Sequence, residues 1–283
     1  MQENTVDEHR DADDAAGRHG KDQAAGAEQP AAQSPASWDP RSHALVRRDD
    51  VDDLAASIPE FSLGLHDYLN LMNEYRAGIR EIQTKFEILD TDMSLRYDRK
   101  PIHSISTRLK SPKSLIEKLR RRDLPISLHA IQTNIFDVAG VRVVCNYLAD
   151  VYDVARHFLA QDDIHLITRK DYIEHPKESG YRSLHLVVSV PVFLADGPHQ
   201  VPVEVQLRTI AMDFWATLEH RLRYKNGHMT AADDDPALAD VRARLVACAD
   251  GIAGIDEAMQ DIREQLDAMH FDQPQDASIS SHL

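Results

Sequence analysis

The sequence lacks several features that define common protein classes. It has only two cysteines, Cys145 and Cys248, in 283 residues. A disulfide framework is therefore excluded, and the apolar neighbours of both residues indicate reduced packing thiols. No apolar run approaches the roughly 20 residues that span a bilayer, and no basic-then-apolar leader begins the chain. The fifteen histidines lack the paired spacing of a zinc site. We therefore expect a cytoplasmic protein with no zinc and no membrane partner.

The sequence also lacks an excess of basic residues. Its 32 Lys and Arg stand against 47 Asp and Glu, a net charge of −15 that argues against a basic protein wrapping nucleic acid. The flanks account for this charge, because residues 1–40 carry −6, residues 232–283 carry −9 and the core is neutral. Within that core, residues 101–123 hold seven basic and two acidic side chains. The net charge therefore conceals a cationic stretch.

Composition and patterning divide the chain into four parts. Residues 1–42 have almost no large apolar side chains and predict a disordered acidic arm. Residues 43–231 are long enough for one domain with a core of ordinary size. Residues 232–270 predict a C-terminal helix used for oligomerisation, and residues 271–283 a disordered tail.

Two segments carry apolar residues at alternating spacings of three and four, which is typical of long amphipathic helices. The first runs from Leu65 to Leu89 and the second from Leu238 to Met269. The second stripe extends over four heptads, more than a helix facing a core usually needs. Either both helices simply pack on the domain, or the second forms a self-association seam, which Gly251 and Gly254 would weaken.

The centre of the chain alternates between strand and helix patterns. The β-rich segments are 135–145, 164–173, 181–192 and 201–208, and the helical ones are 150–161 and 209–224. These patterns predict an α/β (α+β) fold in which helices flank a mixed β-sheet of about five strands, with the long helices at its N- and C-terminal ends.

The cationic stretch has its densest part at RLKSPKSLIEKLRRR, from Arg108 to Arg122. Ser111-Pro112 predicts a helix start, which places Ser114, Lys118 and either Arg121 or Arg122 on one helical stripe. Such cations, with Lys110 beside them, can hold a polyphosphate. A solvated surface and an RNA-binding face are the other interpretations of this run.

Two acidic residues stand out against strand patterns. Asp137 lies at the start of FDVAGVRVV, where it is either a capping residue or a ligand for a hard cation. Glu204 is in the middle of VPVEVQLR, on the face opposite the valines and beside Gln206 and Arg208. Two carboxylates from different strands near a cationic helix suit a magnesium-dependent phosphoryl-type transfer.

The densest polar stretch is KDYIEHPKESGYRSLH, from Lys170 to His185. Glu178-Ser179-Gly180 predicts a turn, after which Tyr181 opens a strand. Its ring can stack a nucleobase beside Lys177 and His185, or it can be an ordinary core tyrosine.

Taken together, four segments resemble the synthetase domain of the RelA/SpoT-type alarmone synthetases, the GTP pyrophosphokinases. They are PIHSISTRLKSPKSLIEKLRRR, FDVAGVRVV, HPKESGYRSLHLVV and VPVEVQLRTIAMDFWATLEH, between about Pro101 and Tyr224. The chain leaves no room for the hydrolase and regulatory domains of the long enzymes, so it is most similar to the small alarmone synthetases. The resemblance implies a nucleotidyltransferase-like synthetase domain and a homotetramer, which the C-terminal heptad stripe suits.

The resemblance also implies a reaction: transfer of the pyrophosphate of ATP to the 3′-hydroxyl of GTP or GDP, with release of AMP. By motif position Asp137 would ligate Mg²⁺, and Glu204 would be the second carboxylate and the base. ATP would be bound by Arg108, Lys110, Ser114, Lys118, Arg121 and Arg142. GTP or GDP would be bound by Lys170, Lys177, Tyr181, His185, Gln206 and Asp213. The family leads us to expect Asn where this chain has Asp213.

Two alternative functions stay open at this point. One is a toxin-like relative that modifies tRNA or another nucleotide, and the acidic C-terminal segment argues against RNA docking. The other is a non-catalytic module that binds alarmone or RNA, which the presence of Asp137, Tyr181 and Glu204 argues against. RNA or alarmone are also possible regulators of an active synthetase.

Overall fold

The computed structural model describes residues 65–97, 99–225 and 236–271, all within one unit that spans residues 44–283. The predicted acidic arm at 1–42 and nearly all of the predicted tail at 271–283 lie outside the described residues. None of the described helices is both long enough and apolar enough to cross a membrane.

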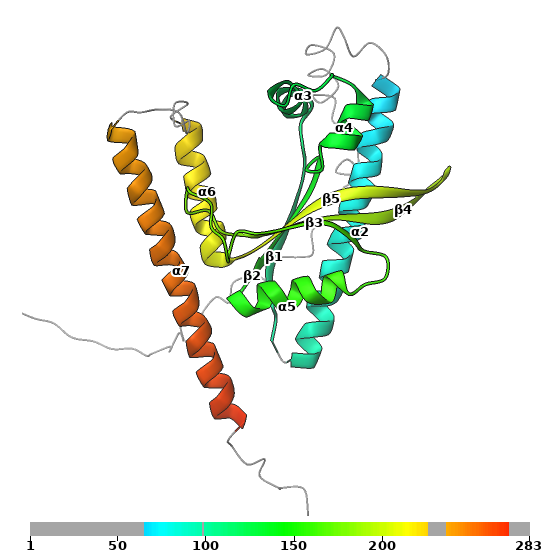
Figure 1. Ribbon diagram of the computed structural model, residues 1–283. Helices are drawn as coiled ribbons and strands as arrows, with labels where there is room; N and C mark the ends of the chain where they lie inside the picture. The colour runs from blue at the N-terminus through cyan, green and yellow to red at the C-terminus, as the bar shows by residue number, and fades with distance from the viewer. Residues whose placement is uncertain (1–64, 98, 226–235, 272–283) are drawn as a thin grey trace, which may run out of the picture. The chain divides into compact units, whose positions relative to one another are not determined.

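A five-stranded mixed sheet forms the centre of the fold (Figure 1). The strands are β1 (Ile102–Leu109), β2 (Ala139–Cys145), β3 (His165–Asp171), β4 (Leu184–Leu194) and β5 (Gly197–Thr209). Their order is β1-β2-β5-β4-β3, and β2 and β5 run parallel while the other neighbours are antiparallel. The predicted α+β class and mixed sheet are confirmed.

One face of this sheet is covered by α2 (Leu65–Tyr97), as the first apolar stripe predicts. The stripe residues Tyr75, Ile82 and Phe86 are buried, and the Phe86 ring stacks on Phe158 of α5 (Leu148–Leu159) with ring centroids 4.4 Å apart. Burying this apolar face removes large side chains from water. The opposite face of β5 is left to polar side chains.

Two helices follow β1, and a third follows β5 directly. Pro112 begins α3 (Pro112–Arg121), and Ser114 N donates to the Ser111 hydroxyl at 3.3 Å, which confirms the predicted helix start. Next come α4 (Leu128–Asn134) and, after β5, α6 (Ile210–Lys225).

Some predicted boundaries were wrong. The segment 135–145 is a strand only from Ala139 onward, because the Ile135 amide donates to Ile131 O and ends α4, and a turn follows. Asp137 therefore lies in that turn. Likewise β4 begins at Leu184, so Tyr181 belongs to the preceding loop. The strand β1 and the short helix α4 were not predicted, since neither has a strong apolar period.

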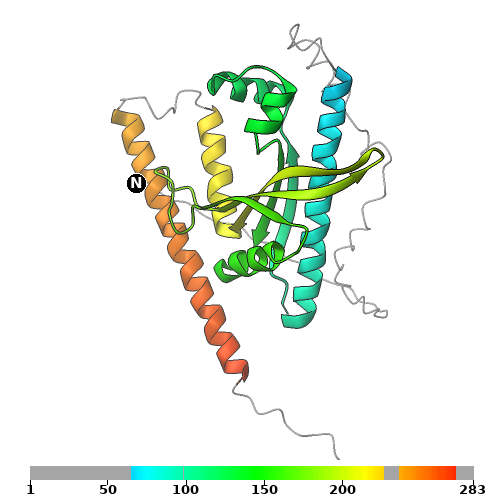
Figure 2. The same ribbon diagram turned by 45° about the vertical axis from the view of Figure 1, so that its right-hand side comes forward.

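The C-terminal helix α7 (Pro236–Phe271) lies beside α6 in both ribbon views (Figures 1 and 2). Its first half packs on α6 through an apolar cluster of Trp215, Ala216 and Ala249. Its second half docks through polar groups: Thr209 Oγ1 donates to Asp256 Oδ2 at 2.5 Å, and Ala149 N donates to Gln260 Oε1 at 3.2 Å. The lower half of its apolar stripe is exposed, at Ile255, Met259, Ile262, Leu266 and Met269. The interpretation that this stripe simply packs on the domain is therefore wrong for that half.

Candidate active site

Asp137 is held in the turn before β2 by two lysines. Lys110 Nζ lies 2.6 Å from Asp137 Oδ2, and Lys118 Nζ of α3 lies 2.7 Å from Oδ1. Burial by itself would raise the pKa of Asp137, but the hydrogen bonds and charges of the two lysines outweigh it and lower the pKa to about 2. Asp137 is therefore an ionised carboxylate that already attracts cations.

Glu204 is the second carboxylate, in the middle of β5 opposite Gly140 of β2. His185 Nδ1 lies 3.3 Å from its Oε1, and Gln206 Nε2 donates to its Oε2 at 3.0 Å. Burial opposes ionisation, yet His185, Gln206 and the charge of Arg108 lower the pKa of Glu204. This carboxylate is also ionised near neutral pH.

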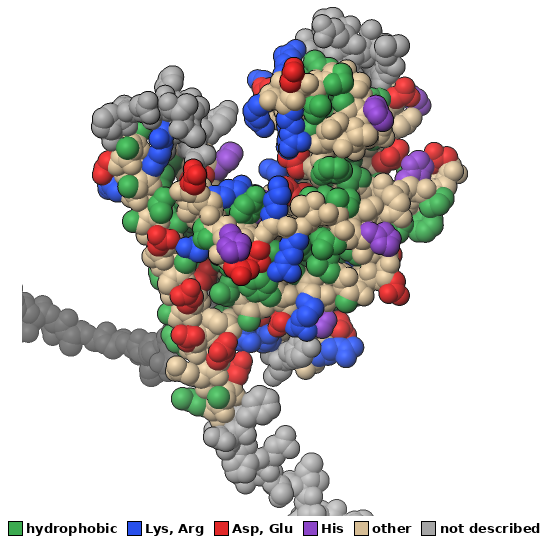
Figure 3. All heavy atoms as spheres, viewed as in Figure 1, with side chains coloured by type: hydrophobic (Ala, Val, Ile, Leu, Met, Phe, Trp, Pro, Cys, Tyr) green, Lys and Arg blue, Asp and Glu red, His purple; other side chains and the backbone are tan. Residues whose placement is uncertain are grey.

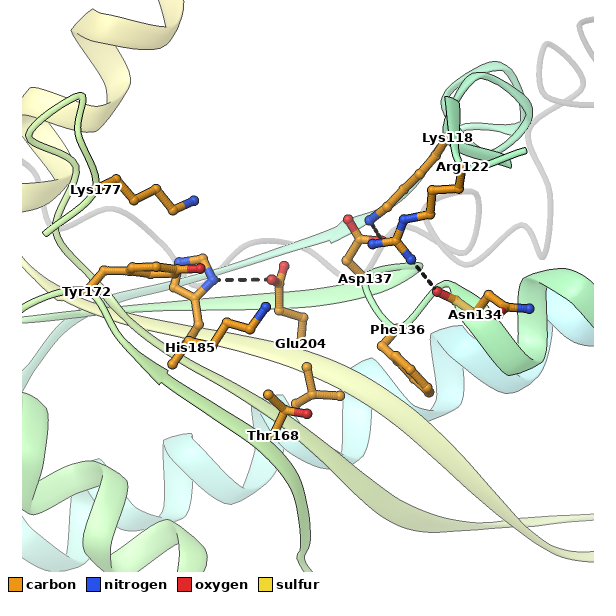
Figure 4. A pocket seen from close by; sticks show the side chains of 12 residues that line it. Lys118, Arg122, Asn134, Phe136, Asp137, Thr168, Tyr172, Lys177, His185 and Glu204 are labelled. Carbon is orange, nitrogen blue, oxygen red and sulfur yellow. Dashed lines mark hydrogen bonds and ion pairs between the residues drawn. The ribbon is translucent and has the colours of Figure 1, made fainter. Parts of the chain in front are cut away.

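A pocket of about 260 Å³ lies between the two carboxylates. Figure 4 shows Lys118 turned toward Asp137 on one side and His185 turned toward Glu204 on the other. The cations that line it come from the C-terminal end of α3, from β3 and from the loop that follows β3: Lys118, Arg122, Lys170 and Lys177. The pocket can hold a group with several negative charges.

The two arginines at the C-terminal end of α3, Arg121 and Arg122, differ in whether they line this pocket. Both arginines are exposed, but only Arg122 lines the pocket, and it donates to Asn134 O at 2.7 Å. Helix α3 ends at Arg121, and Arg122 is its C-terminal capping residue. Ser114 lies half-buried in the first turn of α3.

Arg108 of β1 and Arg142 of β2 line a second pocket, of about 180 Å³, together with Gly140 and Gln206. A Cβ at position 140 would lie 3.2 Å from Arg108 Cγ, so glycine allows the Arg108 side chain to lie close against β2. The Arg108 guanidinium reaches to 3.7 Å from Glu204 Oε2. We call this second pocket the arginine slot. Guanidinium groups stack on aromatic rings, so a pocket lined by two of them suits a flat aromatic base.

A third pocket, of about 430 Å³, contains the aromatic part of the site. Tyr181 lines it with His185 and Gln206, and α6 closes it with His220 and Arg221. Lys177 Nζ lies 4.9 Å from the centroid of the Tyr181 ring and 4.4 Å from that of Tyr172. A cation over an aromatic ring and an aromatic ring at a pocket wall are both suited to a nucleotide.

The loop 172–183 that carries Tyr181 rests on α7. Gly180 adopts a φ of 83°, and a Cβ there would lie 2.6 Å from Ala249 Cβ, so only glycine fits at this contact. Beside it, Arg182 donates to Asp250 Oδ1 at 2.9 Å. The C-terminal helix therefore supports the wall of the third pocket.

Asp213 of α6 lies between two arginines. Its Oδ1 is 3.4 Å from Arg142 NH1 and 3.4 Å from Arg208 NH1. The Asp213 carboxylate therefore lies close to Arg142, which lines the second pocket, and to Arg208, which lines the third.

The structure thus brings most of the predicted residues together around Glu204, but the linings of the three pockets do not include Lys110, Ser114, Arg121 or Asp213. Sequence analysis missed Arg122 as the lining residue, and also Tyr172, Arg208, His220 and Arg221. Tyr172 was within the recognised KDY stretch, and Arg208 was on the recognised polar face of β5, so both could have been included. His220 and Arg221 reach the pocket because of where α6 packs.

On the surface, Lys and Arg side chains gather over α3 and beside the hollow between α3 and α6 (Figure 3). A cationic pocket with two ionised carboxylates, next to an arginine slot and an aromatic pocket, defines an enzyme that handles two nucleotides and their phosphates.

Comparison with known proteins identifies the family. Residues 107–229 match the family model described as a region found in RelA / SpoT proteins. The chain is 36% identical over 203 residues to GTP pyrophosphokinase YwaC of Bacillus subtilis, covering 72% of this chain and 93% of that protein. It is 37% identical over 193 residues to GTP pyrophosphokinase YjbM of the same organism, covering 68% and 86%.

Solved structures agree with this assignment. The crystal structure of small alarmone synthetase 1 from Bacillus subtilis bound to its product pppGpp matches with a TM-score of 0.62 and 36% identity, over 70% of this chain and 97% of that one. A GTP pyrophosphokinase family protein from Streptococcus pneumoniae matches with a TM-score of 0.63 and 30% identity, over 74% and 99%. The chain belongs to the RelA/SpoT family of GTP pyrophosphokinases, among the small alarmone synthetases.

Proposed function

We propose that this chain synthesises (p)ppGpp by transferring the β,γ-pyrophosphate of ATP to the 3′-hydroxyl of GTP or GDP, with release of AMP. The observation that carries the proposal is that the arginine slot, the cationic pocket and the aromatic pocket meet around Glu204. The similarity to a synthetase bound to its product pppGpp supports it.

The donor ATP binds on the β1, β2 and α3 side of the site. Arg108 and Arg142 take the adenine in their slot, and Lys110, Ser114, Lys118 and Arg121 are the residues assigned to the phosphates, with Arg122 joining them. The two substrates together bring about seven to eight negative charges, so several cations are needed before the acceptor oxygen can approach phosphorus.

The acceptor GTP or GDP binds in the aromatic pocket. Tyr181 stacks on guanine, a contact worth about 1–3 kcal/mol. Lys170, Lys177 and His185 hold its phosphates, and Gln206 lies beside the ribose. Asp213 acts near the nucleoside by holding Arg142 and Arg208 in place.

Mg²⁺ is the proposed cofactor, held by Asp137 and Glu204. Both are ionised carboxylates that line one pocket, and oxygen ligands of this kind suit Mg²⁺. Within the described ranges no group of three or more His, Cys, Asp or Glu could hold a metal, so the remaining ligands would be phosphate oxygens and water. When bound, Mg²⁺ would neutralise phosphate charge at the site of transfer.

Glu204 serves as the base for the acceptor hydroxyl. Glu204 is already ionised; His185 Nδ1 faces its Oε1, and Gln206 Nε2 donates to its Oε2. The second lone pair of each oxygen stays available to accept the hydroxyl proton as the oxygen–phosphorus bond forms.

The reaction is tested by incubating the full chain with Mg²⁺, ATP and GTP or GDP, with and without added product, and separating the nucleotides by anion exchange. We expect a guanosine product with a 3′-pyrophosphate and an equal amount of AMP. Absence of this product under all conditions would refute the proposal, and label transferred from ATP to added tRNA instead would identify the toxin-like alternative.

Glu204→Gln tests the base. The amide cannot take up a proton, so we expect kcat to fall by about 10²–10⁴-fold. Glu117→Gln, at an exposed position of α3, is the matched control and should leave turnover unchanged. Substantial activity in Glu204→Gln would show that another group is the base.

Self-association as a homotetramer is the second part of the proposal, with α7 as the seam. The exposed stripe residues continue into an apolar groove between α6 and α7 lined by Phe214, Leu218, Leu222 and Ile252. Contiguous apolar surface of this kind on a helix is typical of an interface. A second copy of the chain presents the same stripe and can cover it.

Light scattering on the full chain tests the seam. Leu266→Asp places a charge in the stripe and should lower the measured mass. Phe193→Asp is the control, because Phe193 is 80% exposed on β4, away from α7. A mass unchanged by Leu266→Asp would rule out this part of α7 as the interface.

Regulation by RNA or by alarmone remains a prediction, supported by the exposed cations Lys113, Arg120 and Arg121 on α3. Cytoplasmic location likewise remains a prediction from sequence.

A further inference from the structure

Arg208 is a buried arginine near the end of β5, on the same face of the strand as Glu204 and Gln206. Only 2% of its surface is exposed. Its NH2 group donates to Gln206 Oε1 at 2.7 Å and to the Tyr181 hydroxyl at 3.2 Å, and its NH1 group lies 3.4 Å from Asp213 Oδ1.

The first chain of contacts from Arg208 passes through Gln206. A guanidinium carries only donors, so the Gln206 atom that faces it must be the amide oxygen. The amide nitrogen then points the other way and donates to Glu204 Oε2 at 3.0 Å. Arg208 thus decides which way round the Gln206 amide lies.

The second chain passes through Tyr181 and His185. Because the Tyr181 oxygen accepts from Arg208, its own proton is free to be donated to His185 Nε2 at 2.9 Å. An Nε2 that accepts leaves the proton of a neutral imidazole on Nδ1, which faces Glu204 Oε1 at 3.3 Å. The ionised carboxylate accepts at the other end of this chain, so Tyr181 and Glu204 each favour the proton on Nδ1, and losing either partner removes part of that preference.

The two chains form a closed ring in which each oxygen of Glu204 receives a donor and Arg208 is the common origin. We propose that Arg208 is a positioning residue that acts on Glu204 through Gln206 and through Tyr181 and His185. By setting the direction of the hydrogen bonds in these two chains, it holds the Glu204 carboxylate in the orientation that can take the proton from the 3′-hydroxyl of the acceptor nucleotide. The proposal rests on the proposed role of Glu204 as base. It also ties that base to Tyr181, the proposed stacking residue for guanine.

The tautomer of His185 is a readout that a merely structural arginine would not move. We would label the histidines of the full chain with ¹⁵N and record spectra at about pH 8, where an ordinary imidazole is neutral. His185→Gln identifies the His185 signals among the fifteen histidines. The wild-type chain should have its proton on Nδ1, and a proton on Nε2 would overturn the proposal.

Substitutions of Arg208 itself test the proposal further. Arg208→Gln introduces an acceptor, so His185 should become a mixture of tautomers and kcat should fall by about 10–100-fold. Arg208→Lys keeps a donor-only side chain and should retain the Nδ1 tautomer and most of kcat. Arg156→Gln, an exposed arginine of α5, is the matched control. An unchanged tautomer and kcat in Arg208→Gln would refute the positioning role.

A further variant covers the case in which Arg208→Gln does not fold. Tyr181→Phe removes only the hydroxyl, so it should release the His185 tautomer while the Gln206 chain stays in place; a tautomer that stays fixed would contradict the proposal. The tautomer is measured without substrate. A chain that makes no alarmone but shows the expected tautomers would refute the proposed function, whereas an active chain with the wrong tautomer would refute the role of Arg208.

Discussion

The two long helices α2 and α7 carry apolar stripes of the same spacing and use them in opposite ways. In α2 the stripe is the core: Ile82 and Phe86 are completely buried against the sheet and α5. In α7 the lower half of the stripe faces outward, and Ile255 and Met269 are 59% and 66% exposed. The face that α7 turns to the domain carries Asp256, Gln260 and Arg263 instead.

This difference shows that α2 is part of the hydrophobic core, whereas α7 packs on the outside of the domain. The sheet surface beneath α2 is apolar and includes Val201 and Val203, which lie next to Gly78 of α2, so apolar contact holds this helix. By contrast, α7 meets the start of α5 and the end of β5, where backbone groups and the buried Asp150 need polar partners. Its apolar stripe is exposed in the single chain, where we propose that a second copy covers it, while the same helix supports the loop that carries Tyr181.

The largest expected effect is in α2. Phe86→Ala would leave a cavity beside Phe158 and should lower the free energy of unfolding by about 3–5 kcal/mol. The matched change in α7, Met259→Ala, should alter it by less than about 0.5 kcal/mol in the dissociated chain. Urea unfolding measures both, and a dependence of the Met259→Ala effect on protein concentration would itself support assembly through α7.

A smaller effect is expected at the polar docking face. Arg263 lies 3.5 Å from the fully buried Asp150, which also pairs with Arg99. Arg263→Ala should lower the free energy that holds α7 in place by about 1–3 kcal/mol. Hydrogen exchange should then show faster exchange in α7 and unchanged exchange in α2.

Arg244→Ala is the control for that measurement, since Arg244 is exposed and its ion pair with Asp240, also on α7, is 3.9 Å long. Equal protection of α7 in Arg263→Ala and in the wild-type chain would mean that apolar contacts, and not the polar face, attach this helix.

The smallest effect is a pH dependence at Asp256. Burial raises the pKa of Asp256 above its usual 3.8, and the hydrogen bond from Thr209 only partly opposes this. The folded chain therefore holds this proton more tightly than the unfolded chain, and its stability falls as pH rises from 3.8 through the raised pKa. Thermal unfolding across this range should show a fall in the wild-type chain that is shallower in Asp256→Asn. Identical profiles would show that Asp256 does not titrate in this way.

Much of the fold could be predicted from local pattern. The stripe of α2, the valines of β5 and the Ser111-Pro112 start of α3 are each determined within a few residues. The boundaries at Asp137 and Tyr181 were not, because the apolar residues Ile135 and Val138 occupy a helix end and a turn there. β1 and α4 were missed because neither has a strong apolar period.

The candidate site shows the same division. The sequence by itself determined the family and which residue types gather: a cationic helix start, two carboxylates on strand-like segments and a tyrosine after a turn. Only the tertiary structure decided that Arg122 lines the same pocket as Lys118 and that Asp213 lies between two arginines. It also decided that Arg208 donates to Gln206, the residue that contacts Glu204. The outward direction of the α7 stripe was decided there too, because a periodic sequence specifies that a helix has an apolar face, but only packing selects what that face meets.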